Sequence, residues 1–252
     1  MTIAAIPRPA TLKQTYSFYV PGRDPSRVRA CAEQADAVVV SGAAGPASVR
    51  SLRVEGWEGA VLFDRAAYGG EVKVDRSRWF DDQRSARADR LLTPGCWVGS
   101  EAGHLSFDRQ IDDEASVARD NNATCVLAVD YRWLTKSSQH DEMLESLRGL
   151  RLPVALVLGD QADPLGLPGA VDALVALTKR VDDLSILRCD HGAIGALAFD
   201  AVHASIGLTT GHRHFVPPGV VASGIPNDRS VRVFVKDLMD WSTASTIGGW
   251  QP

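Results

Sequence analysis

Acidic residues follow four of the apolar runs in this sequence, at the points where each run gives way to polar residues. These residues are Asp64, Asp130, Asp160 and Asp190, and His191 follows the last of them directly. Several carboxylates around one opening coexist when they bind a metal, pair with arginine or differ in pKa. Aspartate and histidine are also common general acids and bases. We therefore predict that Asp64, Asp130, Asp190 and His191 are catalytic.

Other polar and aromatic residues near the ends of the apolar runs are candidates for binding a substrate. Arginine holds anionic groups, and tyrosine stacks on rings. The predicted substrate-binding residues are Tyr19, Arg65, Tyr68, Arg132, Asp160, Gly207, Thr209, Thr210, His212 and Arg213. The stretch 192–211 fits a short helix and a strand that present backbone amides to a phosphate, and it also fits close packing of small residues.

Structural interpretations compete with these assignments. Asp160 lies in GDQADPLG, where aspartate commonly caps a helix or closes a turn. Asp130 with Arg132 fits an ion pair at a rim. His203 lies inside an apolar run, so we expect it to be a hydrogen-bonded interior histidine.

Metal ligation has weaker support. His191, His212 and His214 accompany several aspartates, but there is no H-x-x-x-H pattern on a helix. The cysteines lie far apart, without a C-x-x-C pair, at Cys31, Cys96, Cys125 and Cys189. We predict no cofactor and no bound metal, and metal-assisted hydrolysis stays open as an alternative.

Eight short apolar runs, bounded by turn residues, alternate with stretches of helical character. Most runs are continuous rather than alternating, as in strands buried on both faces. The predicted strands cover 16–20, 37–41, 59–63, 90–93, 124–129, 153–158, 184–189 and 201–206. The predicted helices include 24–34, 108–121, 139–150, 167–180 and 192–199.

This alternation predicts an α/β fold, a single (β/α)8 barrel of the TIM type over residues 1–252. An open doubly wound sheet is the alternative, although no Gly-x-Gly-x-x-Gly turn opens a helix. Active sites of such barrels lie at the carboxyl ends of the strands, where the candidate residues fall. We expect a long loop or lid over 69–89, which can include one short helix. We also expect a C-terminal extension over 212–252, with a closing helix over 231–241.

Composition narrows the classes of partner. Lysine and arginine number 27 against 31 acidic residues, a net charge of −4, and the mean hydropathy is −0.07. This balance does not indicate nucleic-acid binding. No apolar run approaches the roughly 20 residues of a membrane span, and no secretory signal is evident. We expect a cytoplasmic protein that binds a small molecule, and a homodimer is possible.

Two segments resemble the tRNA-guanine transglycosylase superfamily of TIM barrels. Residues 63–70 read FDRAAYGG, similar to the Asp-Ser-Gly-Gly-Phe-Gln pattern of that family. The segment 199–220, ending in HRHFVPPGV, resembles the family's nucleophile strand and the basic loop that follows it. The resemblance implies that Asp64 handles a base. The family's nucleophilic aspartate and its zinc site are not matched, so it implies a relative rather than a working base exchanger.

Two functional hypotheses follow. The first is a transglycosylase-like or lyase-like barrel enzyme that binds a nucleobase, a nucleoside or a sugar phosphate. The second is a catalytically inactive barrel that serves as a binding or assembly component, with Trp79, Phe80 and Trp250 as interface anchors. Carboxylates that converge in one pocket would favour the enzyme. Carboxylates held in separate rim ion pairs would favour the inactive barrel.

Overall fold

The computed structural model describes residues 15–70, 73–101, 105–220, 232–235 and 240–243. The chain divides into two compact units, residues 1–217 and 218–252. The elements of the first unit are β1 (Thr15–Pro21), α1 (Pro25–Ala32), β2 (Ala37–Ser41), α2 (Gly45–Val54), β3 (Val61–Asp64), α3 (Arg76–Ser85), β4 (Cys96–Val98), α4 (Phe107–Asn121), β5 (Cys125–Asp130), α5 (Arg132–Thr135), α6 (Ser137–Leu150), β6 (Val154–Gly159), the 3-10 turn η1 (Pro164–Gly166), α7 (Ala170–Thr178), β7 (Leu184–Cys189), α8 (Gly192–Leu197), β8 (His203–Gly207) and the 3-10 turn η2 (Thr210–His212).

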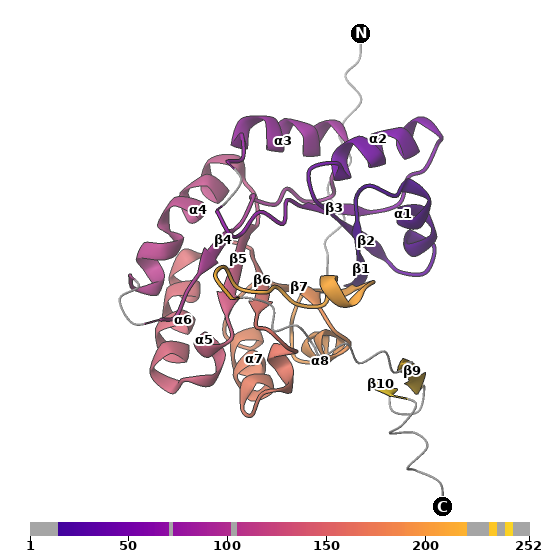
Figure 1. Ribbon diagram of the computed structural model, residues 1–252. Coiled ribbons are helices and arrows are strands. Elements are labelled where there is room, and N and C mark those ends of the chain that lie inside the picture. Colours follow the sequence, from indigo (N-terminus) through magenta and orange to yellow (C-terminus); the bar gives the residue numbers. More distant parts are fainter. Residues whose placement is uncertain (1–14, 71–72, 102–104, 221–231, 236–239, 244–252) are drawn as a thin grey trace, which may run out of the picture. The chain divides into compact units, whose positions relative to one another are not determined.

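The first unit is a (β/α)8 barrel of the TIM type, as the sequence predicts. Its eight strands are parallel, in the order β3-β2-β1-β8-β7-β6-β5-β4, so the first and last strands pair with each other. The helices lie outside the strands (Figure 1). The ring opens between β3 and β4, which are the two edges of the sheet.

Side chains from α3 and its flanking loop cover the open edges. The Gln83 amide donates to the Leu92 carbonyl (2.8 Å) and accepts from the Leu92 amide (3.0 Å), as a neighbouring strand would. The Trp79 indole also donates to the Leu92 carbonyl (2.9 Å), and Asp89 accepts from the amide of Val61. Buried backbone groups at the gap therefore have partners, which an open sheet edge normally lacks.

Three apolar clusters make the core. One lies inside the ring and joins small and branched residues from β1, β2, β3, β5, β6 and β7, including Val39, Val126 and Ala155. The other two lie between the strands and the helices, one on α1, α2 and α3 and the other on α4, α6 and α7. Strands buried on both faces explain the continuous apolar runs in the sequence.

The charge-rich segment 69–89 contains the helix α3, so the short helix expected there is present, whereas the prediction of a long loop or lid over the whole segment was wrong. Asp75 caps the first turn of α3, because its carboxylate accepts from the amide of Arg78 (3.0 Å). Trp79 and Phe80 point into the core with 4% and 1% of their surface exposed. Their prediction as interface anchors was therefore wrong, and Trp250 lies outside the described residues.

The fourth strand is displaced from its predicted position. Leu92 makes only an isolated bridge to Thr124, and the paired strand is β4, over Cys96–Val98. Pro94 has no amide hydrogen to donate, and Gly95 has φ +90, so the ladder cannot run through them. The predicted strand 90–93 was wrong for this reason.

The described part of the second unit is an antiparallel pair, β9 (Arg232–Val235) and β10 (Asp240–Thr243). We predicted a closing helix over 231–241, and this was wrong. Val233 and Val235 alternate with Arg232 and Phe234 in β9, and β-branched residues at a period of two favour a strand. Among the described residues, no helix is long and apolar enough to cross a membrane.

Candidate functional site

All carboxyl ends of the parallel strands open at one end of the barrel, which we call the mouth. The strand registers place Asp64 beside Ser41 and Asp130 beside Gly159 at this end. The chain after β8 returns across it, and we call residues 208–217 the strap (orange in Figure 1). The strap pairs with the end of β6, since the Phe215 amide donates to the Leu158 carbonyl (3.1 Å). The strap therefore crosses the end of the barrel at which Asp64 and Asp130 lie.

Asp64 lies fully buried at the end of β3 and is surrounded by donors. The Tyr19 hydroxyl donates to Asp64 Oδ2 at 2.6 Å, and the Tyr68 hydroxyl donates to the same oxygen. The Ala66 amide donates to Asp64 Oδ1 at 2.9 Å. Three of the residues predicted for the site, Tyr19, Asp64 and Tyr68, thus form one hydrogen-bonded cluster, which we call the tyrosine–aspartate cluster.

Both phenols of this cluster stay protonated. Burial raises the pKa of Tyr19 and of Tyr68 well above the ordinary value, and the neighbouring Asp64 carboxylate raises both further. Neutral hydroxyls can only donate to the carboxylate, so the cluster is satisfied within itself. The cluster links β1 to β3 at the mouth through the hydrogen bond from Tyr19 to Asp64.

Asp130 belongs to a second, separate group. Its carboxylate accepts from the Arg132 amide (2.9 Å), and its other oxygen lies 3.5 Å from the Arg132 guanidinium. The same guanidinium lies 3.5 Å from Glu101. Asp130 is 5% exposed, so this pair resembles the structural ion pair weighed as the alternative.

Asp190 belongs to a third group, at the end of β7. Its Oδ1 lies 2.7 Å from His191 Nδ1, and its Oδ2 lies 3.3 Å from the Arg213 guanidinium. Arg213 also donates towards the Gly207 carbonyl at 3.4 Å. Asp190 thereby ties the strap to β7, and its partners are distinct from those of Asp64 and Asp130.

Arg188, which we did not predict, enters the mouth because β7 bulges. The register between β7 and β8 shifts between Ile186 and Cys189, and Arg188 has φ +54. Ile186 and Cys189 pack in the outer core and Leu187 packs in the inner one. In a regular strand Arg188 would point outward, because Leu187 before it points inward. The bulge instead points both side chains inward.

The Arg188 guanidinium lies near the tyrosine–aspartate cluster, since its charge acts on both phenols, but it forms no ion pair among the described residues. No carboxylate pairs with it in the part of the chain that the structure describes. One nitrogen donates to the Gly211 carbonyl (2.8 Å), and its Nε is buried without a hydrogen-bond partner. Burial, and then the charge of Arg188, lower the pKa values of His212 and His214. The mouth is therefore electropositive at this point.

An aromatic group stands beside Arg188. The Phe215 ring of the strap lies 5.1 Å from the Tyr68 ring and 5.4 Å from the Trp97 ring, and the Arg188 guanidinium lies 5.7 Å from it. Gly159 makes room, because a Cβ there would lie 2.6 Å from the Trp97 ring. Trp97 and Phe215 are both partly exposed.

Most of the remaining predicted residues lie in the strap or next to it. The strap backbone packs closely against Gly207, because a Cβ there would lie 2.0 Å from the His212 carbonyl oxygen. Thr209 Oγ1 lies 2.6 Å from His212 Nδ1, and the His212 ring lies 5.7 Å from the Tyr19 ring. The Asp160 amide donates to the Phe215 carbonyl at 2.9 Å. Thr210 begins η2, and Arg65 is a partly exposed neighbour of Asp64.

His203 lies deeper in the barrel. Its Nε2 lies 2.8 Å from the Ser17 hydroxyl, and both side chains are fully buried. Burial and the nearby Arg90 lower its pKa to about 4. Its Nδ1 has no hydrogen-bond partner, so the expectation of an interior histidine holds with one ring nitrogen left unsatisfied.

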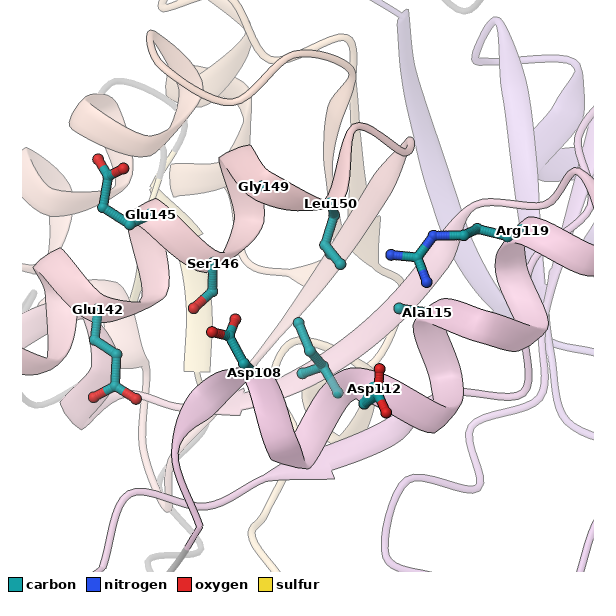
Figure 2. Close-up of a pocket in the computed structure, with 10 residues that line it drawn as sticks. Asp108, Asp112, Ala115, Arg119, Glu142, Glu145, Ser146, Gly149 and Leu150 are labelled. Atoms are coloured by element: carbon teal, nitrogen blue, oxygen red, sulfur yellow. The ribbon is translucent and has the colours of Figure 1, made fainter.

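Two surface hollows lie away from the mouth. One, of about 500 Å³, lies between α4 and α6, where carboxylates from both helices border it (Figure 2). Glu142, one of these, already accepts from the Phe107 amide (2.8 Å) at the start of α4. The other, of about 570 Å³, includes Arg180 and Asp183. Neither contains a predicted site residue. We place the candidate site at the mouth because the charged side chains of Asp64 and Arg188 lie there.

No group of three or more histidine, cysteine or acidic side chains in the described ranges is arranged to hold a metal ion. Two of the three histidines considered from the sequence are hydrogen-bonded to side chains near them. His191 lies against Asp190, and His212 lies against Thr209. These contacts give no support to metal-assisted hydrolysis.

No protein-family model and no curated protein matches the sequence. A xylose isomerase-like TIM barrel/4-hydroxyphenylpyruvate dioxygenase fusion protein is similar in structure, with 15% identity and a TM-score of 0.49 over 77% of this chain and 38% of that one. The alanine racemase of Clostridium difficile 630, in complex with cycloserine, has 10% identity and a TM-score of 0.39 over 81% and 55%. This chain thus spans less than two thirds of either. The fold assignment rests on the strand order and register above.

Proposed function

We propose that the barrel binds a small anionic ligand at its mouth, with Arg188 as the residue that holds the anionic group. The observation that carries this proposal is the inward guanidinium without a carboxylate partner among the described residues. Its Nε is a buried donor with no acceptor, and such a group normally costs about 1–3 kcal/mol. A phosphate or carboxylate on the ligand would satisfy it by a charge-assisted hydrogen bond.

The backbone at Arg188 supports the same proposal. A residue other than glycine at φ +54 costs on the order of 1–3 kcal/mol, and such strain clusters at functional sites. Here the strain accompanies the bulge that turns the guanidinium inward. The protein therefore keeps a strained conformation that points a positive charge into the mouth.

The predicted acids support binding rather than proton transfer. Asp64, Asp130 and Asp190 each belong to a different group of partners, the arrangement that favours a binding barrel. For Asp64 to act as a base, a tyrosine hydroxyl would have to leave its carboxylate. Transglycosylase-like chemistry at Asp64 stays a prediction from the family resemblance.

Calorimetric titration of the full chain with ribose 5-phosphate and inorganic phosphate tests the proposal. We expect Arg188→Met to weaken binding about 10- to 100-fold, because a hydrogen bond to a charged group contributes about 1.5–3 kcal/mol. Arg132→Met is the matched control, since its guanidinium is already paired with Asp130 and Glu101. Unchanged affinity in Arg188→Met would refute the proposal. A larger loss in Arg132→Met would move the site to β5.

A further inference from the structure

Phe215 stands apart from the other aromatic residues of the mouth because it comes from the strap. Its neighbours come from the barrel itself. Tyr68 follows β3, Trp97 lies in β4 and Arg188 lies in β7. The three surround the Phe215 ring with one edge-on ring at 84°, one tilted ring at 58° and one cation. Such surroundings bind planar rings in general, through quadrupole and cation–π attraction.

The backbone of Phe215 is anchored independently of its ring. The Phe215 amide donates to the Leu158 carbonyl (3.1 Å), and its carbonyl accepts from the Asp160 amide (2.9 Å). Neither bond involves the side chain. Phe215 is partly exposed, so its ring can rotate away about χ1 while both backbone bonds remain.

We infer that the Phe215 ring occupies the position of a planar ring of the ligand, and that the ligand class is an aromatic base joined to a phosphate. This inference rests on the proposed anion site, because Arg188 contacts Phe215 and would hold the phosphate beside the displaced ring. Phe215 then acts as an internal competitor. The ligand's ring replaces it against Tyr68 and Trp97 when the Phe215 side chain turns outward, and the backbone of the strap stays in place.

Titration of the full chain with the four common nucleoside monophosphates and with ribose 5-phosphate tests this inference. In Phe215→Ala the competing ring is gone, so we expect at least one nucleoside monophosphate to bind about five- to tenfold more tightly than to the unsubstituted chain. The affinity for ribose 5-phosphate should change by less than about twofold. Phe215→Leu keeps an apolar side chain, so it should bind the nucleoside monophosphate with an affinity between those of the other two chains. It also serves as a second variant in case Phe215→Ala does not fold.

The matched control is Phe199→Ala, which removes a ring that is 41% exposed after α8. Nucleoside monophosphates that bind Phe215→Ala no better than the unsubstituted chain, while ribose 5-phosphate still binds, would overturn the ring inference and leave the anion site standing. If no phosphate binds the unsubstituted chain or Phe215→Ala, the proposed function fails and this inference fails with it.

Discussion

Asp64 and Arg188 are opposite charges that face the same mouth, and they differ in how far the protein satisfies them. Asp64 is fully buried and accepts from two tyrosine hydroxyls and one amide. Arg188 is partly exposed, has a strained backbone and leaves a buried Nε without an acceptor. The charge of Arg188 lowers the pKa values of the strap histidines, and it opposes the rise in the pKa values of Tyr19 and Tyr68 that burial and Asp64 cause.

The difference separates a charge that supports the fold from a charge that supports binding. A buried carboxylate with all its acceptors used contributes to stability, and removing it leaves buried donors without partners. A guanidinium without a counterion contributes little to stability and is available to an anion. Residue type alone would rank Asp64 as the functional group of the pair. The contacts reverse that ranking.

Stability measurements should show the contrast most strongly. We expect Asp64→Ala to lower the free energy of unfolding by about 3–5 kcal/mol, because two buried hydroxyls lose their acceptor. Arg188→Met should lower it by less than about 1 kcal/mol, since the substitution also removes a buried donor that has no acceptor. Urea denaturation of both variants measures this, and Asp64→Asn, which keeps one acceptor oxygen, should lie between them. Equal losses in Asp64→Ala and Arg188→Met would remove the distinction.

A pH series extends the comparison to the buried His203. Its folded pKa of about 4 lies below the ordinary 6.5, so the unfolded chain binds this proton first as the pH falls. The contribution of neutral His203 is therefore complete above about pH 6.5 and is lost progressively towards pH 4, by about 3 kcal/mol in all. Urea denaturation at pH 7 and at pH 4.5 measures the loss.

The control for this series is His203→Gln, which keeps a polar side chain but does not titrate. His140, His212 and His214 also have lowered pKa values and act in the same direction, and they remain in the variant. The difference between the two chains therefore isolates His203. If the free energy of unfolding had the same pH dependence in both chains, protonation of His203 would not affect stability.

A glycine pair sharpens the comparison at the strap. We expect Gly207→Ala to lower the free energy of unfolding by about 1–3 kcal/mol and to weaken phosphate binding, because its Cβ would meet the His212 backbone. Gly211→Ala has open space within 4 Å and should change neither quantity. Thermal unfolding with and without ribose 5-phosphate measures both effects. Similar behaviour of the two variants would show that the strap shifts freely.

Local sequence patterns were sufficient for most of the barrel, because a strand buried on both faces needs a continuous apolar run. The runs AVVVS and TCVLAV predicted β2 and β5 within a residue at each end. The apolar runs gave a wrong position for the fourth strand. The pair Leu91 and Leu92 was the more evident apolar signal, and the strand is the short segment Cys96–Val98. Apolar content identifies burial there, but the side chain of Gln83, nine residues earlier, takes the backbone hydrogen bonds of Leu92.

The sequence by itself determined the alternating barrel and the residue types at the strand ends, including Tyr19, Asp64 and Tyr68. Only the tertiary structure brought Tyr19 to Asp64, 45 residues away, because β1 and β3 flank β2 in the sheet. It also decided the role of Arg188. A charged residue inside the run LSILRC was a visible signal, but its direction depends on a bulge created by pairing with β8. Side-chain direction in a strand follows its neighbours in space, which the local sequence does not contain.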